Sequence, residues 1–333
     1  MYKLKVLFTT LMLLFLMPCF INNVQAQEVS IRPPTFTPNA KAALLMDYDT
    51  GKIVYSINEK HPLAPASITK LMTIYIVLEI IHSGEVSWNT PITTSLNVEQ
   101  IEEAQVFLKQ GEAYSLREMV KAMLIPSAND AAVAIAENIA GSETEFVKLM
   151  NAKAKELGLK NCHFINATGL PTHTVNDSYH YMSAYDIATL ARKLIGDYPE
   201  LLEVTSLKNT TFRHGSYVIE NTNDLLGNYQ GMDGLKTGFT NRAKRCLCST
   251  AKRGDLRLIS VILGAPSEYE RKISTINLLN YGFISYAPVK ESNMKKEAAE
   301  KIHAALLKSV KQHPTLLLHI PSHKPWLNYY ILN

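Results

Sequence analysis

The stretch PASITKLMTIYIVLEI, residues 65–80, places a serine and a lysine three positions apart at the start of an apolar helical pattern. Residues with this spacing share one face of a helix, so the hydroxyl of Ser67 and the amine of Lys70 can touch. A capped helix with a surface lysine gives the same pattern, and so does a nucleophile beside its activating base. The stretch alone therefore leaves both interpretations open.

Two further short motifs follow along the chain. They are Ser127-Ala128-Asn129 and Lys236-Thr237-Gly238. Taken singly, Ser127 fits a helix N-cap and Lys236 fits a solvated lysine on a strand. Together and in this order, the three motifs are typical of β-lactamases and penicillin-binding proteins. The combination predicts acyl transfer to a serine.

The order of the predicted elements indicates an α+β fold. Two apolar runs joined by Asp-Thr-Gly in residues 42–57 predict a hairpin. Helical patterns follow, with capping signals of the type Ser-x-x-Glu or Ser-x-x-Asp at Ser115, Ser127 and Ser183. After about residue 205 the chain reads as strands and a closing helix. Segregated runs of this kind predict an antiparallel sheet flanked by helices.

The N-terminus predicts export. Two lysines precede an apolar run that ends in small residues, the pattern of a secretory signal peptide over residues 1–26. The alternative is a lipoprotein modified at Cys19, for which the preceding proline is a poor neighbour. A Pro-rich extended leader over residues 27–38 then precedes a catalytic domain at residues 39–286. The expected location is extracytoplasmic, in the cell envelope or periplasm.

Charge and cysteine content exclude several classes of protein. Lys and Arg number 34 and Asp and Glu number 30, and most of the small positive excess lies after residue 287, so a nucleic-acid binder is not indicated. Removing the signal peptide leaves three cysteines (Cys162, Cys246 and Cys248), an odd number that argues against a disulfide framework. Because no Cys or His cluster has zinc spacing, we expect neither a metal nor an organic cofactor.

Longer segments around the motifs resemble the serine D-alanyl-D-alanine carboxypeptidases, the low-molecular-mass penicillin-binding proteins of peptidase family S11. The matching segments are LLMDYDTGKIVY (44–55), PASITKLMT (65–73), MLIPSANDAAVAIAE (123–137), FINATGLP (164–171), YMSAYDIATLAR (181–192), MDGLKTGFT (232–240) and RLISVILGAP (257–266). The resemblance implies a β-lactamase/transpeptidase-like fold, with a five-stranded antiparallel sheet packed against helices. This agrees with the α+β order inferred from the residues.

The chemistry explains why a lysine stands beside the serine. A hydroxyl is a poor nucleophile until a base takes its proton, and an exposed lysine, with a pKa near ~10.4, is charged at neutral pH. Burial or a second cation lowers that pKa, and Lys236 is the candidate second cation. We therefore expect Lys70 to act as the base towards Ser67.

The resemblance implies roles for the remaining motif residues. Ser127 relays a proton towards the leaving amine, and Asn129 positions the substrate. Lys236, Thr237 and Gly238 belong to the strand that edges the site, where a substrate backbone can pair as an added strand. The backbone N–H groups of Ser67 and Phe239 form the oxyanion hole.

A carboxypeptidase must also bind a free C-terminal carboxylate. The resemblance points to Arg271 together with Thr237, since a guanidinium suits a carboxylate. A solvated helix arginine is the alternative, and the neighbouring Lys272 is a second candidate for the role. The implied substrates are peptidoglycan stem peptides ending in D-Ala-D-Ala, and β-lactams are expected to acylate Ser67 as mimics of that dipeptide.

Two features depart from the family pattern. Lys244 stands where glycine is expected after the Lys-Thr-Gly strand, which raises the question of how the following turn is built. The 287–333 segment reads as a basic amphipathic helix and tail, and the usual β-rich second domain is apparently absent. Such a helix either docks on the body of the protein or associates with a membrane surface.

Rival functions share parts of this pattern. A class A β-lactamase needs a glutamate that activates the deacylating water, and no clear Glu-x-x-Leu-Asn element occurs between residues 140 and 236. A D,D-endopeptidase uses the same acyl-enzyme chemistry and stays open. A peptidoglycan-binding module without catalysis is disfavoured by the intact motifs, and a Ser-His-Asp hydrolase lacks its Gly-x-Ser-x-Gly elbow.

Overall fold

The computed structural model describes residues 32–171 and 180–312. The chain divides into two units, one spanning Pro33–Ile284 and the other including the chain from Ser285 onward. The predicted signal peptide (residues 1–26) and residues 27–31 of the predicted leader lie outside the described residues, as do residues 313–333.

A five-stranded antiparallel sheet is the frame of the unit Pro33–Ile284. In spatial order its strands are β2 (Ile53–Ile57), β1 (Ala42–Asp47), β11 (Leu256–Ala265), β10 (Lys244–Arg253) and β9 (Met232–Thr240). The predicted hairpin is β1 and β2, and β1 pairs on its other side with β11, so that the two ends of the unit meet in one sheet. The predicted α+β fold is confirmed, and β9 lies at an edge of the sheet.

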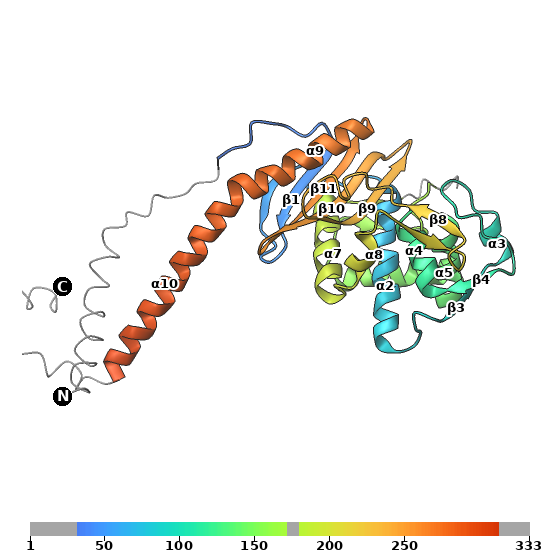
Figure 1. Cartoon of the computed structure of the whole chain (residues 1–333), viewed down its shortest axis with the longest axis horizontal. Helices are drawn as coiled ribbons and strands as arrows, with labels where there is room; N and C mark the ends of the chain where they lie inside the picture. Colours follow the sequence, from blue (N-terminus) through green and yellow to red (C-terminus); the bar gives the residue numbers. More distant parts are fainter. Residues whose placement is uncertain (1–31, 172–179, 313–333) are drawn as a thin grey trace, which may run out of the picture. The chain divides into compact units, whose positions relative to one another are not determined.

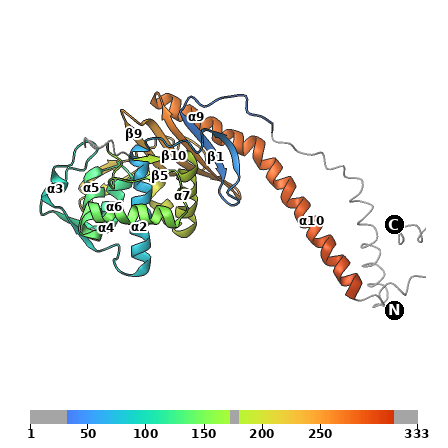
Figure 2. The same ribbon diagram turned by 180° about the vertical axis from the view of Figure 1, so that it is seen from behind.

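Helices pack on both faces of this sheet (Figures 1 and 2). The helices of the unit are α2 (Lys70–Ser83), α3 (Leu96–Glu99), α4 (Leu116–Leu124), α5 (Asn129–Ala140), α6 (Glu143–Glu156), α7 (Ala184–Asp197), α8 (Leu201–Thr205) and α9 (Glu268–Tyr281). Helix α9 contacts β10 and β11 on one face, and α7 contacts β1 and β11 on the other. Three two-stranded sheets complete the unit: β3 (Pro91–Thr93) with β4 (Ala113–Ser115), β5 (Cys162–His163) with β6 (Tyr181–Met182), and β7 (Asn209–Phe212) with β8 (Tyr217–Glu220).

Helix α2 runs through the centre of the helical region. Leu71, Met72, Ile74 and Leu78 on it are fully buried. Among the described residues, the window Ala66–Ser83 is long and apolar enough to cross a membrane, but 67% of it is buried inside the protein. It is therefore a core helix, and it brings the Ser67 end of the helix up to the sheet.

The capping signals are confirmed in part. Ser115 and Ser183 accept hydrogen bonds from the backbone N–H three residues on, as N-caps do. Ser127 was wrongly predicted as a cap: α5 is preceded by Ala128, with no side-chain cap, and Ser127 has φ +71°. A residue held in this left-handed conformation cannot form the extended N-cap geometry.

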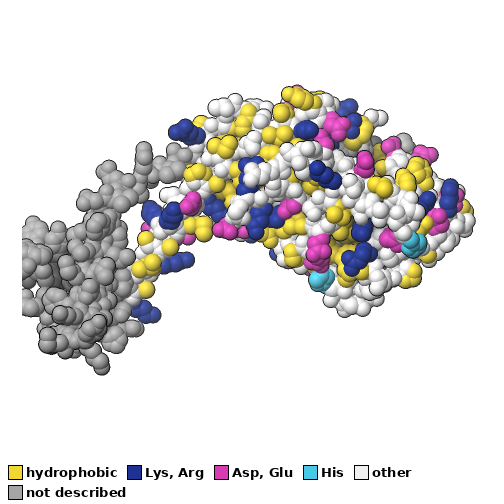
Figure 3. Space-filling view, viewed as in Figure 1, with side chains coloured by type: hydrophobic (Ala, Val, Ile, Leu, Met, Phe, Trp, Pro, Cys, Tyr) yellow, Lys and Arg dark blue, Asp and Glu magenta, His cyan; other side chains and the backbone are white. Residues whose placement is uncertain are grey.

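The second unit contains helix α10 (Ala287–Gln312), which follows a π-helical turn at Gly282–Tyr286. Apolar and lysine side chains both stand on the surface of α10 (Figure 3). Met294 and Ile302, two of the apolar positions predicted for an amphipathic helix, are 60% and 57% exposed.

Candidate active site

Ser67 lies in a tight 3-10 turn, Ala66–Thr69, that leads directly into α2. Ala66 has φ +51°, a conformation that costs a non-glycine residue about 1–3 kcal/mol. Ser67 itself is partly exposed, whereas Ala66, Ile68 and Thr69 are buried. The expectation that a serine cap opens this helix is wrong, since Pro65 occupies the cap position. The Ser67 hydroxyl instead contacts Lys70.

Two glycines press against this turn from different parts of the chain. A Cβ on Gly238 of β9 would lie 2.7 Å from the Pro65 carbonyl oxygen and 3.2 Å from the Ser67 nitrogen. A Cβ on Gly169 would lie 2.0 Å from the Ala66 carbonyl oxygen. Distances under 3.0 Å are incompatible with a side chain, so both positions require glycine to let the backbones approach the turn that carries Ser67.

Lys70 is fully buried and its Nζ has three hydrogen-bond partners. They are Ser67 Oγ at 2.9 Å, Asn129 Oδ1 at 2.7 Å and the Thr168 carbonyl oxygen at 3.2 Å. An ammonium has three N–H donors, which these three acceptors satisfy. A neutral amine has two N–H donors and one lone pair. Because a carbonyl and an amide oxygen only accept, the lone pair then faces the one partner that can donate, the Ser67 hydroxyl.

The surroundings favour the neutral amine. Burial lowers the pKa of Lys70 well below its ordinary value, and the positive charge of Lys236 lowers it further, while Asp130 acts in the opposite direction. The pKa of Lys236 falls to about 7, first through burial and then through the nearby Arg271. The predicted lowering of the Lys70 pKa by a desolvated cleft and a second cation is thus present in the structure.

Asn129 and Ser127 stand at the start of α5. Asn129 accepts the Lys70 bond through Oδ1, and its Nδ2 donates to the Glu102 carbonyl oxygen at 3.1 Å, which fixes the orientation of the amide. Asn129 therefore holds the amine of Lys70, a contact that sequence reasoning did not anticipate. Ser127 is 7% exposed and left-handed, with φ +71°.

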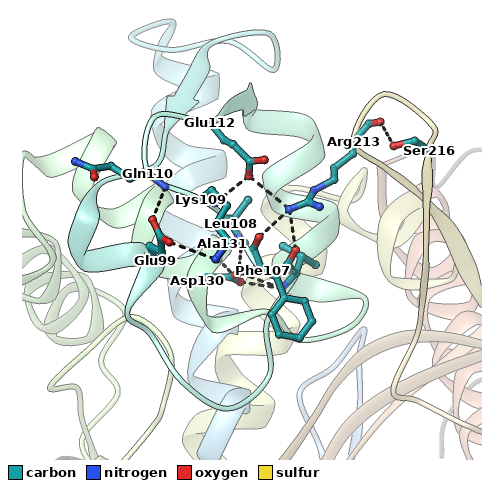
Figure 4. Close-up of polar contacts among 11 residues, drawn as sticks. Glu99, Phe107, Leu108, Lys109, Gln110, Glu112, Asp130, Ala131, Arg213 and Ser216 are labelled. Carbon is teal, nitrogen blue, oxygen red and sulfur yellow. Dashed lines mark hydrogen bonds and ion pairs between the residues drawn. The ribbon is translucent and has the colours of Figure 1, made fainter.

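Asp130, next along α5, fastens the preceding loop to the site (Figure 4). Its buried carboxylate accepts hydrogen bonds from the backbone N–H groups of Val106, Leu108 and Ala131. Arg213, from the β7–β8 hairpin, donates to the Phe107 carbonyl oxygen at 2.7 Å from the other side. The loop around Phe107 is thereby pinned between α5 and the hairpin.

The Lys-Thr-Gly motif lies on the edge strand β9. Lys236 is 1% exposed, and its Nζ contacts the Thr237 carbonyl oxygen at a long 3.4 Å. The Thr237 hydroxyl shares a hydrogen bond of 2.5 Å with Thr222. Phe239 is 49% exposed, with the guanidinium of Arg245 3.8 Å above its ring.

Arg271 is 3% exposed, so it is not a solvated helix arginine. Its Nη2 bonds Asp224 at 3.0 Å and Glu268 at 3.3 Å, while its buried Nε has no hydrogen-bond partner among the described residues. Lys272, the other candidate, is 38% exposed and pairs with Asp224. The positive charge of Arg271 contributes to the lowered pKa of Lys236 on the Lys-Thr-Gly strand.

Comparison with known proteins identifies the family. The profile of the D-alanyl-D-alanine carboxypeptidases, Peptidase_S11, matches residues 27–267. The chain belongs to this family. It is 39% identical over 285 residues to D-alanyl-D-alanine carboxypeptidase DacF of Bacillus subtilis, covering 85% of this chain and 72% of that protein. It is 37% identical to a D-alanyl-D-alanine endopeptidase of Pseudomonas aeruginosa over 77% of this chain and 84% of that one.

Solved structures agree with this assignment to the S11 carboxypeptidases. Penicillin-binding protein D2 from Listeria monocytogenes, in its ampicillin-bound form, superposes with a TM-score of 0.69 at 36% identity, covering 75% of this chain and all of that one. DacD from Francisella tularensis gives a TM-score of 0.72 at 34% identity, covering 79% and 75% of the two chains. The protein is a penicillin-binding D-Ala-D-Ala carboxypeptidase of the transpeptidase fold.

Lys244, the departure from the S11 pattern, adopts the conformation that glycine prefers. It has φ +60°, begins β10, and points its side chain into solvent. The turn before it is closed by the Ala243 N–H, which donates to the Thr240 hydroxyl at 3.0 Å. The lysine therefore costs backbone strain of about 1–2 kcal/mol but leaves β9 and β10 paired in register.

Sequence reasoning missed three contributors to this carboxypeptidase site. They are the Thr168 carbonyl, the Asp130 carboxylate and the left-handed turn at Ala66. The first lies in the FINATGLP segment, which resembles the family but offered no side chain with an evident chemical role. Among the described residues, no cluster of His, Cys, Asp and Glu is arranged to hold a metal ion, and the three cysteines Cys162, Cys246 and Cys248 are free thiols.

Proposed function

We propose that the D-Ala-D-Ala carboxypeptidase activity of this protein proceeds through an acyl-enzyme on Ser67, with Lys70 as the base. Ser67 Oγ forms a bond to the carbonyl carbon of the penultimate D-alanine while its proton passes to Lys70 Nζ. The peptide C–N bond then breaks, and the terminal D-alanine leaves after its nitrogen takes a proton by way of Ser127. Water hydrolyses the ester and restores the serine.

The observation that carries the proposal is the 2.9 Å contact between Lys70 Nζ and Ser67 Oγ. It is supported by the burial, which lowers the pKa of Lys70 and favours the neutral amine, and by the two fixed acceptors that turn its lone pair towards the hydroxyl. A general base in hydrogen-bond contact with its proton donor meets the geometric requirement for proton transfer.

Substrate binding involves strand β9 and the residues near it. The open edge of β9 offers backbone groups that can pair with an extended stem peptide. Lys236, Thr237 and Arg271 supply cationic and hydroxyl donors for the terminal carboxylate, and Arg271 Nε is buried with no partner of its own among the described residues. The N–H groups of Ser67 and Phe239 complete the site as the oxyanion hole, each donor contributing about 3–4 kcal/mol to the transition state.

Intact-mass spectrometry with a fluorescent penicillin tests the nucleophile. The wild-type protein should gain the mass of one penicillin and the Ser67→Ala variant should gain none, while both retain the same thermal unfolding temperature. Release of D-alanine from a stem pentapeptide should stop in the same variant. A penicillin adduct on folded Ser67→Ala would refute the assignment.

Cleavage of cross-links by the same acyl-enzyme is the second candidate activity. The 37% identity to the Pseudomonas aeruginosa endopeptidase supports it. Product analysis on a purified cross-linked dimer and on a monomeric pentapeptide separates the two, since only an endopeptidase converts the dimer to monomers.

We infer further that the protein works outside the cytoplasm, where peptidoglycan lies, and that α10 contacts a membrane surface. Six lysines and three glutamates on this helix give it a positive charge, and Met294 and Ile302 are exposed. Such a helix binds anionic bilayers through apolar burial and charge together. Flotation with anionic vesicles should recover the protein and lose it in the double variant Met294→Glu/Ile302→Glu. Flotation unchanged by that variant would exclude α10 as the contact.

A further inference from the structure

The segment that supplies the Thr168 carbonyl to Lys70 is organised around one side chain, Asn166. Its Oδ1 accepts hydrogen bonds from Thr168 N at 3.1 Å, Thr168 Oγ1 at 2.9 Å and Gly169 N at 2.8 Å. Its Nδ2 donates to the Leu170 carbonyl oxygen at 3.0 Å. The amide thus sits inside the turn and ties both of its ends, which fixes the direction in which the Thr168 carbonyl points.

His180 in turn orients Asn166 from the next described stretch of chain. Its Nε2 lies 2.8 Å from Asn166 Oδ1, and its Nδ1 accepts from the Ile165 N–H at 3.4 Å. Because the backbone N–H can only donate and the amide oxygen can only accept, the ring is neutral with its proton on Nε2. Burial, with smaller contributions from the neighbouring His163 and Lys70, lowers the pKa of His180 to about 3, so the ring stays neutral near pH 7.

The residue between Asn166 and Thr168 is held as well. Ala167 N donates to Glu143 at 2.9 Å, and the Ala167 carbonyl oxygen accepts from the Thr73 hydroxyl on α2 at 2.8 Å. The turn is therefore docked on the same helix that carries Lys70. Asn166, Thr168 and His180 are buried, and each has hydrogen-bond partners inside the protein. A turn on the surface could be closed with fewer hydrogen bonds than this.

We propose that Asn166, oriented by His180, is a positioning residue for acylation: it fixes the Thr168 carbonyl as the acceptor that turns the Lys70 lone pair towards Ser67. The proposal rests on the proposed role of Lys70 as the base. With the carbonyl in place, the neutral amine spends its two N–H donors on Asn129 and Thr168. Without it, one N–H is free to point at Ser67, and the lone pair then turns away from the proton it must accept.

The acylation rate constant at saturating penicillin separates positioning from binding. Asn166→Ala should lower this constant by about 10- to 100-fold, the effect of a misplaced reacting group. The penicillin concentration for half-saturation should change by less than about threefold, because the hydrogen bonds of Asn166 go to its own turn and to His180. A variant with an unchanged rate constant and weakened binding would overturn the proposal.

Asn151 provides a matched control in the same segment. Its side chain ties the other end, donating to the Phe164 carbonyl oxygen at 2.8 Å and accepting from Phe164 N at 3.0 Å. Asn151→Ala should therefore lower the unfolding temperature much as Asn166→Ala does, yet keep the wild-type acylation rate constant. If both variants lowered the acylation rate constant equally, Asn166 would have only a structural role and the proposal would be wrong.

Variants of His180 keep the proposal testable if Asn166→Ala fails to fold. His180→Leu removes the donor to Asn166 and should lower the rate constant about 10-fold. His180→Gln retains an N–H of similar reach and should restore most of it. If Leu and Gln at this position acylate at the same rate, the hydrogen bond to Asn166 has no part in positioning.

The pH profile adds a readout that loss of stability cannot mimic. The charged or titratable groups around Lys70 are Lys236 on β9, Asp130 on α5 and His180. Asn166→Asp keeps the acceptor for Thr168 and Gly169 but adds a negative charge beside this set, which favours the ammonium. The acid limb of the acylation profile should move to higher pH, whereas Asn151→Asp should leave it in place. An unmoved limb in Asn166→Asp would contradict the proposal.

Failure of the inference and failure of the proposed function give different results. If Lys70→Met acylates normally, Lys70 is not the base, whatever the Asn166 variants do. If Lys70→Met is inactive while Asn166→Ala keeps the wild-type rate constant, only the positioning role is lost.

Discussion

Two buried lysines, Lys70 and Lys236, belong to the candidate site and differ in how many hydrogen-bond acceptors surround the amine. Lys70 has an acceptor for each of its N–H groups. Lys236 has one long contact of 3.4 Å among the described residues. The first arrangement suits a base, because every contact fixes the direction of its lone pair. The second suits a binding group, because its donors become satisfied only when a ligand brings acceptors.

The largest expected effect is on the chemical step. Lys70→Met should lower the acylation rate constant by about 10²–10⁴-fold, the contribution of a general base, measured with fluorescent penicillin at saturation. Lys236→Met should instead weaken binding and shift the acid limb of the profile to higher pH, because the cation that lowers the Lys70 pKa is gone. If both variants lost the same factor in the acylation rate constant and in penicillin binding, the assignment of Lys70 as base and Lys236 as binding group would be wrong.

A smaller effect tests the binding side. Arg271→Gln should slow D-alanine release from a peptide with a free C-terminus by about 10- to 100-fold, as expected for a lost hydrogen bond to a charged group. Hydrolysis of a C-terminally amidated peptide provides the comparison, because this substrate lacks the carboxylate and its rate should be little changed. Lys272→Gln is the matched control, since this neighbour also pairs with Asp224 but is 38% exposed. A larger loss in Lys272→Gln would transfer the carboxylate role to that residue.

The smallest effect is on stability. The pKa of Lys236 is about 7 in the folded protein and near its ordinary value of 10.5 when unfolded. Between these values the unfolded chain binds the extra proton, so the destabilisation by this lysine is fully present below pH 7 and decreases as the pH rises from 7 towards 10.5. Lys236→Met should therefore be more stable than wild type at pH 7, with a gap that narrows by at most about 1.4 kcal/mol per pH unit up to pH 9.

Chemical denaturation at each pH measures this gap. Taking the difference between variant and wild type cancels the buried thiols of Cys246 and Cys248, whose raised pKa values act in the opposite direction above pH 8. A gap that widens with pH would mean that the pKa of Lys236 is raised in the folded protein, as it is for a lysine in an ion pair.

The sequence was sufficient for most of the elements and for the motif residues that the structure brings together at the candidate site. Ser67, Lys70 and the Lys-Thr-Gly strand belong to short motifs, and the sheet follows from alternating or β-branched runs. It was insufficient where a role depends on a backbone atom or on an approach between distant segments. Nothing local marks the Thr168 carbonyl as a partner of Lys70, and the same is true of the burial of Arg271.

The error at Ser127 has a similar cause. The pattern Ser-x-x-Asp fits a capping box locally, but Asp130 is recruited by the N–H groups of Val106 and Leu108, residues more than twenty positions away. With its expected partner engaged, Ser127 is free to take the left-handed backbone that the site imposes. Tertiary contacts here override a local signal of ordinary strength.

The close approach of Gly169 and Gly238 to the Ala66–Ser67 turn links reactivity to the completion of folding. The turn holds an unfavourable backbone conformation at Ala66, and the two segments packed against it come from positions far along the chain. Until both have docked, nothing holds Ala66 in place, and Ser67 has no defined position relative to Lys70. We therefore expect a partly folded chain to be inert towards penicillin, so that covalent labelling would count only molecules whose folding is finished.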